Sequence, residues 1–202
     1  MNVFKFGGAS VKDANGVKNL AKALKKVGYK NTLIVVSAMG KTTNAIEQVI
    51  NVYFNNKAEL QSAIQEVKKF HNAILIDLFE NENHAVYNKV TKLFAELEAF
   101  LNNNKSPDYN FVYDQTISYG ELISTTIVSA YLDDVGLKNN WLDIRDFIKT
   151  DNYYRCANVN WEATQKLISS KIDSKVLSIT QGFIASDSNN FTTTLGREGR
   201  DY

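Results

Sequence analysis

The stretch Val3-Phe4-Lys5-Phe6-Gly7-Gly8-Ala9-Ser10-Val11 decides the predicted fold, because a short apolar run ends there in two consecutive glycines and a polar helical pattern follows. Gly7 and Gly8 have no side chains, so they can adopt backbone angles closed to other residues and let an anion approach their N–H groups. Lys5 adds a mobile positive charge beside this turn. A strand, a glycine turn and a helix in this order predict a phosphate-binding loop.

The residues after the glycines can place a helix N-terminus at the same turn. Ser10 or Asp13 can cap this helix, whose N-terminus carries roughly half a positive charge and favours anions. An ordinary tight turn explains the glycine pair about equally well when the segment is taken alone. The segment matches neither the Walker loop nor the dinucleotide fingerprint, so the rest of the chain must decide between the two interpretations.

The first quarter of the chain alternates between strand and helix patterns. We expect a buried strand at residues 2–6, a helix at 12–27, an apolar strand at 32–36 and a helix that begins near Thr42 or Thr43. This order implies a parallel sheet covered on both faces, with ligands at its carboxyl edge. Either threonine can cap its helix or hold a ligand carboxylate at that edge.

The remaining sequence begins with a helical insertion and then returns to alternation. Apolar residues recur with helical spacing over about residues 58–103, with a break near 81–83. The other expected elements are a helix at 115–131, a strand at 140–144, a loop or hairpin at 145–158, a helix at 161–170 and a strand at 176–180.

Gly120 and Glu121 stand near the start of the helix expected at 115–131. A glycine costs a helix about 1 kcal/mol relative to alanine, so Gly120 suggests close approach of another backbone or a ligand. Glu121 can accept an ammonium group. Taken in isolation, a surface glutamate in the first turns of a helix is the simpler interpretation.

The composition excludes several classes of function. The 202 residues carry a formal net charge of 23 − 22 = +1, which predicts no nucleic-acid or polyanion surface. The apolar runs are far shorter than the roughly 20 residues of a membrane helix, and the N-terminal run does not resemble a signal peptide. We therefore expect a soluble, cytoplasmic protein with no membrane partner.

Cysteine, histidine and aspartate residues give no metal-binding pattern. Cys156 is the single cysteine, which excludes an internal disulfide and favours a packing role. His71 and His84 lie in the helical insertion, distant from every motif and without a second ligand type at metal spacing, so no metal site is predicted. The aspartates expected to face solvent are Asp133, Asp134, Asp143 and Asp146.

Four segments, in this order, resemble the aspartate kinases of the amino-acid kinase superfamily. The N-terminal Lys-Phe-Gly-Gly-Ala-Ser-Val is similar to the family opening K-F-G-G-[TS]-S-V. The other segments are VVSAMGKTTN at 35–44, SYGELIS at 118–124, and TQGFI at 180–184 running on to TTTLGR at 192–197. Their order and spacing span the whole chain, so chance is a poor explanation.

The resemblance implies a three-layer α/β fold of the amino-acid kinase type, with a mainly parallel central sheet, helices on both faces and the helical insertion at about 58–103. Residues 1–202 would form the N-terminal portion of one kinase domain, the aspartate-binding and phosphate-loop half. The adenine-binding half and paired regulatory ACT modules would follow Tyr202, so the fold is expected to be incomplete.

The implied activity is transfer of the ATP γ-phosphoryl group to the side-chain carboxylate of L-aspartate, giving 4-phospho-L-aspartate. This reaction is the first step of lysine, threonine and methionine biosynthesis, and it would use ATP with Mg²⁺. Phosphoryl transfer depends on positioning and charge stabilisation. With little grip on the nucleoside, the chain alone is expected to be inactive. A homodimer is left open.

The resemblance also assigns the site. Lys5 and Asp201 would be catalytic, with Asp201 organising the centre. Arg197 offers a planar fork of donors suited to a carboxylate. Lys5, Gly7, Gly8 and Ser10 would bind the phosphates, and Ser37, Thr43, Glu121 and Arg197 would bind aspartate.

Two positions depart from the family pattern T-T-T-L-G-R-G-G-S-D-Y. Glu198 stands where glycine is usual, and Arg200 places a bulky cation where the family uses a hydroxyl against the substrate.

Two alternatives stay open. One is another superfamily member that phosphorylates glutamate, acetylglutamate or a nucleoside monophosphate, although the motif set favours aspartate. The other is a non-catalytic amino-acid-binding or assembly module that keeps the pocket but lacks transfer.

Overall fold

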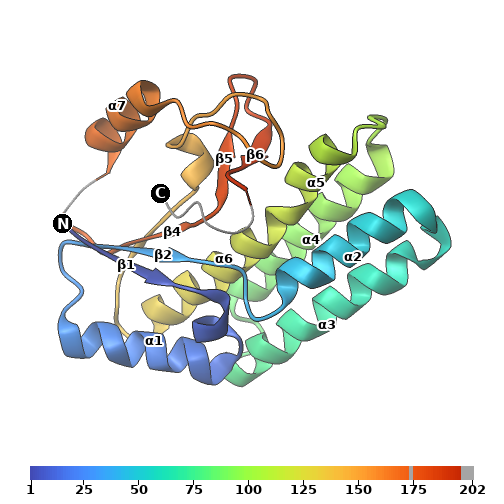
Figure 1. Cartoon of the computed structure of the whole chain (residues 1–202). Coiled ribbons are helices and arrows are strands. Elements are labelled where there is room, and N and C mark those ends of the chain that lie inside the picture. Colours follow the sequence, from blue (N-terminus) through green and yellow to red (C-terminus); the bar gives the residue numbers. More distant parts are fainter. Residues whose placement is uncertain (173–174, 197–202) are drawn as a thin grey trace.

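A parallel sheet forms the centre of the chain, whose computed structural model describes residues 1–172 and 175–196 (Figure 1). Its strands follow the order β1-β2-β4-β3. Lys5 pairs with Val35 and Phe6 with Val36, so β1 and β2 end in register. The sheet strands are Asn2–Phe6 (β1), Thr32–Val36 (β2), Asn140–Leu142 (β3) and Ser178–Gln181 (β4).

Helices lie on both sides of this sheet. Figure 1 shows α1 and α6 on one side and α7 on the other. All four residues of β4 are buried, as expected for a strand covered on both faces. The helices are Ala14–Val27 (α1), Thr42–Asn55 (α2), Leu60–Leu78 (α3), Ala85–Asn103 (α4), Tyr109–Ile117 (α5), Tyr119–Asp134 (α6) and Trp161–Lys171 (α7).

The local sequence explains where α1 begins and ends. The Asp13 carboxylate accepts the Gly16 N–H at 2.8 Å, which caps the helix. Gly28 ends it with a left-handed φ of 91°, a conformation that favours glycine. The apolar face buries Val17, Leu20, Ala21 and Leu24, which belong to the same apolar core as the sheet residues Ile34 and Val36.

The helical insertion consists of α3 and α4, which pack against α2 and α6 respectively (Figure 1). A separate antiparallel hairpin follows the sheet and is made of Ile184–Ser186 (β5) and Thr192–Thr194 (β6). One-turn 3₁₀ segments occur at Gly8–Val11, Lys57–Glu59 and Ile144–Asp146.

The prediction of one helix over 115–131 is wrong, because the chain forms α5 and α6 with a break at Ser118. The Ser118 hydroxyl donates to the Gln115 carbonyl at 3.1 Å, a local bond that competes with regular helix bonding. Asp108 begins α5 by accepting the N–H groups of Asn110 and Phe111.

The predicted fold class is confirmed: the chain is α/β, with a mainly parallel sheet and helices on both faces. The prediction of a buried strand at residues 2–6 is wrong, because β1 lies at the edge of the described sheet, pairs with β2 alone, and has no buried residue. Across residues 1–172 and 175–196, no helix is long and apolar enough to cross a membrane.

Candidate active site

The loops after β1 and β2 lie side by side at the carboxyl edge of the sheet. The Ser37 N–H donates to the Phe6 carbonyl at 3.0 Å, and the Gly40 N–H donates to the Gly8 carbonyl at 3.0 Å. The strand pairing therefore continues beyond the strands themselves. This edge, which we call the rim, consists of residues 5–10, 37–43 and 120–121.

Gly8 has its place in the rim because no side chain would fit there. A Cβ at this position would lie 2.7 Å from the Ala38 carbonyl oxygen and 3.1 Å from that of Gly40. A Cβ at Gly7 would meet nothing within 4 Å. Gly8 thus fixes the contact between two loops, whereas Gly7 has open space at the position of a Cβ.

The first turn of α6 closes the rim from the side. A Cβ on Gly120 would lie 3.1 Å from the Ala38 Cβ and 3.4 Å from the Thr42 Cγ2, so helix and loop are nearly in contact. One turn later, the Ser124 hydroxyl donates to the Ser37 carbonyl at 2.7 Å. Gly120 therefore meets another chain segment closely, as its position in a helix predicts.

Glu121 is buried at the rim, which rules out a surface position for this side chain. It is 3% exposed, and the Ala38 N–H donates to its carboxyl group. Among the described residues, its Oε2 atom has no hydrogen-bond partner. Burial raises the pKa of Glu121 to about 8, with the backbone bonds opposing the shift. A cationic ligand group at Oε2 would favour the ionised form.

The other predicted rim residues lie on its loops and helix ends. Lys5 is exposed near the end of β1, and Ser10 is exposed in the 3₁₀ turn, with its N–H donating to the Gly7 carbonyl. Ser37 and Thr43 are half-buried, the latter in the first turn of α2. Lys5, Gly7, Gly8, Ser10, Ser37, Thr43 and Glu121 all belong to the carboxyl edge of the sheet.

Arg197 and Asp201 lie outside the described residues, as do Glu198 and Arg200. Within residues 1–172 and 175–196, no group of three or more His, Cys, Asp or Glu side chains could hold a metal ion.

Helix α5 fixes the hairpin strand β6 beside the rim through two side chains that the sequence did not reveal. The Asp114 carboxylate accepts the N–H and hydroxyl of Thr194 at 2.9 and 2.8 Å. The Gln115 amide accepts the Thr192 N–H at 3.0 Å and donates to the Thr192 carbonyl at 2.7 Å. No local pattern could identify these contacts, because they join positions about 80 residues apart.

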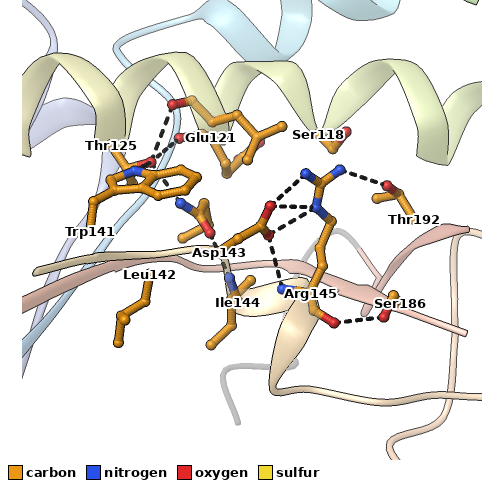
Figure 2. Close-up of polar contacts among 12 residues, drawn as sticks. Ser118, Glu121, Thr125, Trp141, Leu142, Asp143, Ile144, Arg145, Ser186 and Thr192 are labelled. Carbon is orange, nitrogen blue, oxygen red and sulfur yellow. Dashed lines mark hydrogen bonds and ion pairs between the residues drawn. The ribbon is translucent and has the colours of Figure 1, made fainter. Parts of the chain in front are cut away.

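Arg145 fixes the outer end of the same hairpin (Figure 2). Its guanidinium donates to both carboxylate oxygens of Asp143, at 2.9 Å to Oδ1 and 2.6 Å to Oδ2, and to the Thr192 hydroxyl at 3.1 Å. The prediction that Asp143 faces solvent is therefore wrong, since this pairing holds it partly buried. Asp133 is also partly buried, where it accepts two bonds from Asn139.

His71 contacts a motif segment, contrary to the expectation that it lies far from all of them. It is fully buried in α3, its Nδ1 lies 2.8 Å from the Val67 carbonyl, and its Nε2 lies 3.3 Å from the Thr42 hydroxyl. The Thr42 hydroxyl itself donates to the Met39 carbonyl and does not cap α2. Burial lowers the pKa of His71 to about 4, so the ring is neutral at pH 7.

A cavity of about 300 Å³ opens between α5, the loop at 151–157 and the end of β6. It belongs to the carboxyl edge of the sheet, since the Leu195 N–H donates to the carbonyl of Phe183, which follows β4. Its lining residues are Asn110, Tyr113, Arg155, Cys156, Phe183, Thr194 and Gly196.

Tyr113 links this cavity to the rim. Its hydroxyl donates to Glu47 Oε1 at 2.8 Å, and Glu47 lies one helical turn after Thr43 in α2. A second cavity, of about 340 Å³, lies between α4, α6 and Trp141, and no residue of the four motif segments lines it.

The whole chain, residues 1–202, matches the model of the family described as "Amino acid kinase family". The chain belongs to the amino acid kinase family. Among curated relatives, a bifunctional aspartokinase/homoserine dehydrogenase 2 of Arabidopsis thaliana is 28% identical, across 100% of this chain and 23% of that protein. The lysine-sensitive aspartokinase 3 of Escherichia coli is 26% identical, across 99% of this chain and 44% of that protein.

A solved structure of this family has the same fold. The chain superimposes on Escherichia coli aspartokinase III in complex with aspartate and ADP with a TM-score of 0.88, at 26% identity, over 100% of this chain and 45% of that one. The predicted resemblance to aspartate kinases is confirmed. The chain spans less than half the length of the relatives it matches.

Proposed function

We propose that the chain is the aspartate-binding and phosphate-loop part of an aspartate kinase. The reaction of that kinase transfers the ATP γ-phosphoryl group to the side-chain carboxylate of L-aspartate and gives 4-phospho-L-aspartate. Residues 1–202 correspond in this proposal to the N-terminal portion of one kinase domain. The relatives described above are aspartokinases, and one was solved with aspartate and ADP, which supports this assignment.

The observation that carries the proposal is the convergence of three motif segments at one rim. The backbone bonds between Gly8 and Gly40, and the contact of Gly120 with Ala38, join segments far apart in sequence. If the glycine pair formed only an ordinary tight turn, contacts between these distant segments would not be expected. A cavity with polar and aromatic walls lies at the same edge of the sheet, where open α/β folds bind ligands.

The phosphate groups are assigned to the first loop. The open backbone of Gly7 permits close approach of an anion, and Lys5 supplies positive charge beside it. Gly8 contributes by holding the loop against its neighbour, with Ser10 following in the next turn. In this arrangement the loop N–H groups and Lys5 would stabilise the charge on the phosphoryl group during transfer, and the loop would form no covalent bond to it.

The amino acid is assigned to the loop after β2 and to α6. Glu121 would face the substrate ammonium, whose charge would remove the proton that burial otherwise keeps on this carboxyl group. Thr43 and Ser37 would donate hydroxyl hydrogen bonds, and Arg197 would pair with a carboxylate. Lys5 and Asp201 are the proposed catalytic residues.

The proposed cofactors are ATP and Mg²⁺, and bound Mg²⁺ neutralises charge on nucleotide phosphates. The described part of the chain offers no carboxylate cluster for the ion, so we assign no protein residue to it. Magnesium is commonly held by substrate phosphates and a few carboxylates. We further propose a cytoplasmic location and a role in lysine, threonine and methionine biosynthesis.

Ligand-dependent thermal shifts test this proposal. L-Aspartate should raise the melting temperature, because a ligand that binds only the folded state stabilises it. L-Glutamate, N-acetylglutamate and uridine monophosphate should have little effect at the same concentration. A larger shift with one of these compounds would assign the chain to a different substrate in the same family.

A coupled ATP-consumption assay with L-aspartate distinguishes an enzyme from a binding module. We expect turnover far below the 1–100 s⁻¹ that is typical of kinases, since the chain spans less than half of its relatives. Turnover near that range would show that residues 1–202 are sufficient for catalysis.

A further inference from the structure

Arg155 has a backbone conformation that few residues of its kind adopt. Its φ of 67° lies in the left-handed region, which costs a bulky side chain on the order of 1 kcal/mol. The Arg155 N–H donates at 2.9 Å to the carboxylate of Asp114, which is fully buried. This bond holds the backbone in place and determines where the side chain points.

The Arg155 guanidinium lies over two aromatic rings of α5. Its central carbon is 4.5 Å from the Tyr113 ring centroid and 5.6 Å from that of Tyr109. Stacking of this kind orients a planar guanidinium and leaves the N–H donors at its edge available. In the part of the chain that the structure describes, these side-chain donors have no hydrogen-bonded acceptor.

The cavity beside this guanidinium is suited to an anion. Of the seven described residues that line it, Arg155 alone is charged. Thr194 and Gly196 form the opposite wall, directly before Arg197 in the sequence. Asp114 bonds both Arg155 and Thr194, so one buried carboxylate fixes the two walls relative to each other.

We propose that Arg155 is a specificity-determining residue that pairs with a carboxylate of the amino-acid ligand in this cavity. The inference rests on the proposed function, and it adds a second guanidinium to the one assigned to Arg197. A flat fork of donors matches a carboxylate with two parallel hydrogen bonds. Phosphate oxygens could accept the same two hydrogen bonds. We favour a carboxylate of the amino acid, because Tyr113 bonds to Glu47, which lies one helical turn from the proposed aspartate-binding residue Thr43.

Calorimetric titration of the 202-residue chain with L-aspartate tests this inference. Arg155→Met keeps an apolar stem over Tyr113 but removes the charge, and should weaken L-aspartate binding about 10- to 100-fold. Arg155→Lys keeps the charge but lacks the planar pair of donors, so its affinity for L-aspartate should lie between those of the wild type and Arg155→Met. Lys22→Met, on the exposed side of α1, removes one positive charge far from the cavity and should leave binding within about twofold.

Two further arms make the result specific. Arg155→Gly relieves the left-handed backbone, so it should stay folded and still bind L-aspartate weakly. Pyrophosphate binding should be unchanged in all variants. The inference would be overturned if Arg155→Met and Arg155→Gly bound L-aspartate as tightly as the wild type. It would also be overturned if these variants lost binding of pyrophosphate and kept binding of L-aspartate. Absence of L-aspartate binding in the wild type would instead refute the proposed function.

Discussion

Replacing Gly8 by alanine tests whether the two rim loops depend on each other. The new Cβ would lie 2.7 Å from the Ala38 carbonyl oxygen, closer than real Cβ atoms approach, so the backbone must move. Overpacking of this kind costs about 1–3 kcal/mol. Separating the loops also weakens the bond from the Gly40 N–H to the Gly8 carbonyl, worth about 1 kcal/mol. We expect Gly8→Ala to lower the free energy of unfolding by about 2–4 kcal/mol.

Gly7→Ala is the matched control for this substitution. The neighbouring position has φ −70° and ψ 165°, which alanine adopts readily, and its Cβ would meet nothing within 4 Å. Its stability should be unchanged or slightly higher, because alanine reduces the entropy of the unfolded chain. Thermal unfolding followed by circular dichroism would show a fall of about 5–15 °C for Gly8→Ala alone. Equal melting temperatures for the two variants would refute the close approach of the loops.

Three other changes have expected outcomes. Acid should destabilise the chain through His71, whose pKa is about 4 in the folded chain against an ordinary value of 6.5. The stability that the neutral ring contributes above pH 6.5 is lost as the pH falls toward 4, and the free energy of unfolding should be about 2 kcal/mol lower at pH 5. Urea unfolding of wild type and His71→Gln at pH 7 and pH 5 measures this, and a variant with the same pH dependence as wild type would contradict it. Glu121→Gln should add on the order of 2 kcal/mol of stability at pH 7 and little at pH 4.5, because the raised pKa of Glu121 makes stability fall as pH rises from 4.5 through 8. The same urea assay tests it, and equal gains at both pH values would argue against a buried ionisable group. Asp114→Asn should cost about 2–4 kcal/mol, since a buried carboxylate accepts three bonds, whereas Thr194→Val, which removes one of them, should cost about 1 kcal/mol; similar losses in both variants would contradict this ranking.

The sequence predicted the elements whose local pattern is strong. The glycine turn after residues 2–6, the apolar strand at 32–36 and the helical insertion all have periodicity or turn residues that act within a few positions. Their parallel arrangement follows from the strand, helix, strand order. These features position Lys5 and the two glycines at the carboxyl edge without any information from distant parts of the chain.

The features that the sequence did not reveal depend on contacts between distant residues. The break between α5 and α6 occurs at Ser118, where one side-chain bond interrupts a sequence with a continuous helical pattern. The burial of Glu121 depends on the loop at Ala38, and the contacts of Asp114 and Arg155 join α5 to segments about 40 and 80 residues away. The position of His71 beside Thr42 likewise arises only when α3 packs on α2.

A nuclear magnetic resonance titration with L-aspartate tests the central claim most directly. Glycine amides report on each loop of the site: Gly8 and Gly40 in the rim, Gly120 at the start of α6, and Gly196 in the cavity wall. All four amides are expected to shift together and saturably with L-aspartate, and not with D-aspartate. Shifts confined to the cavity between α4 and α6, where Ser129 lies, would contradict it.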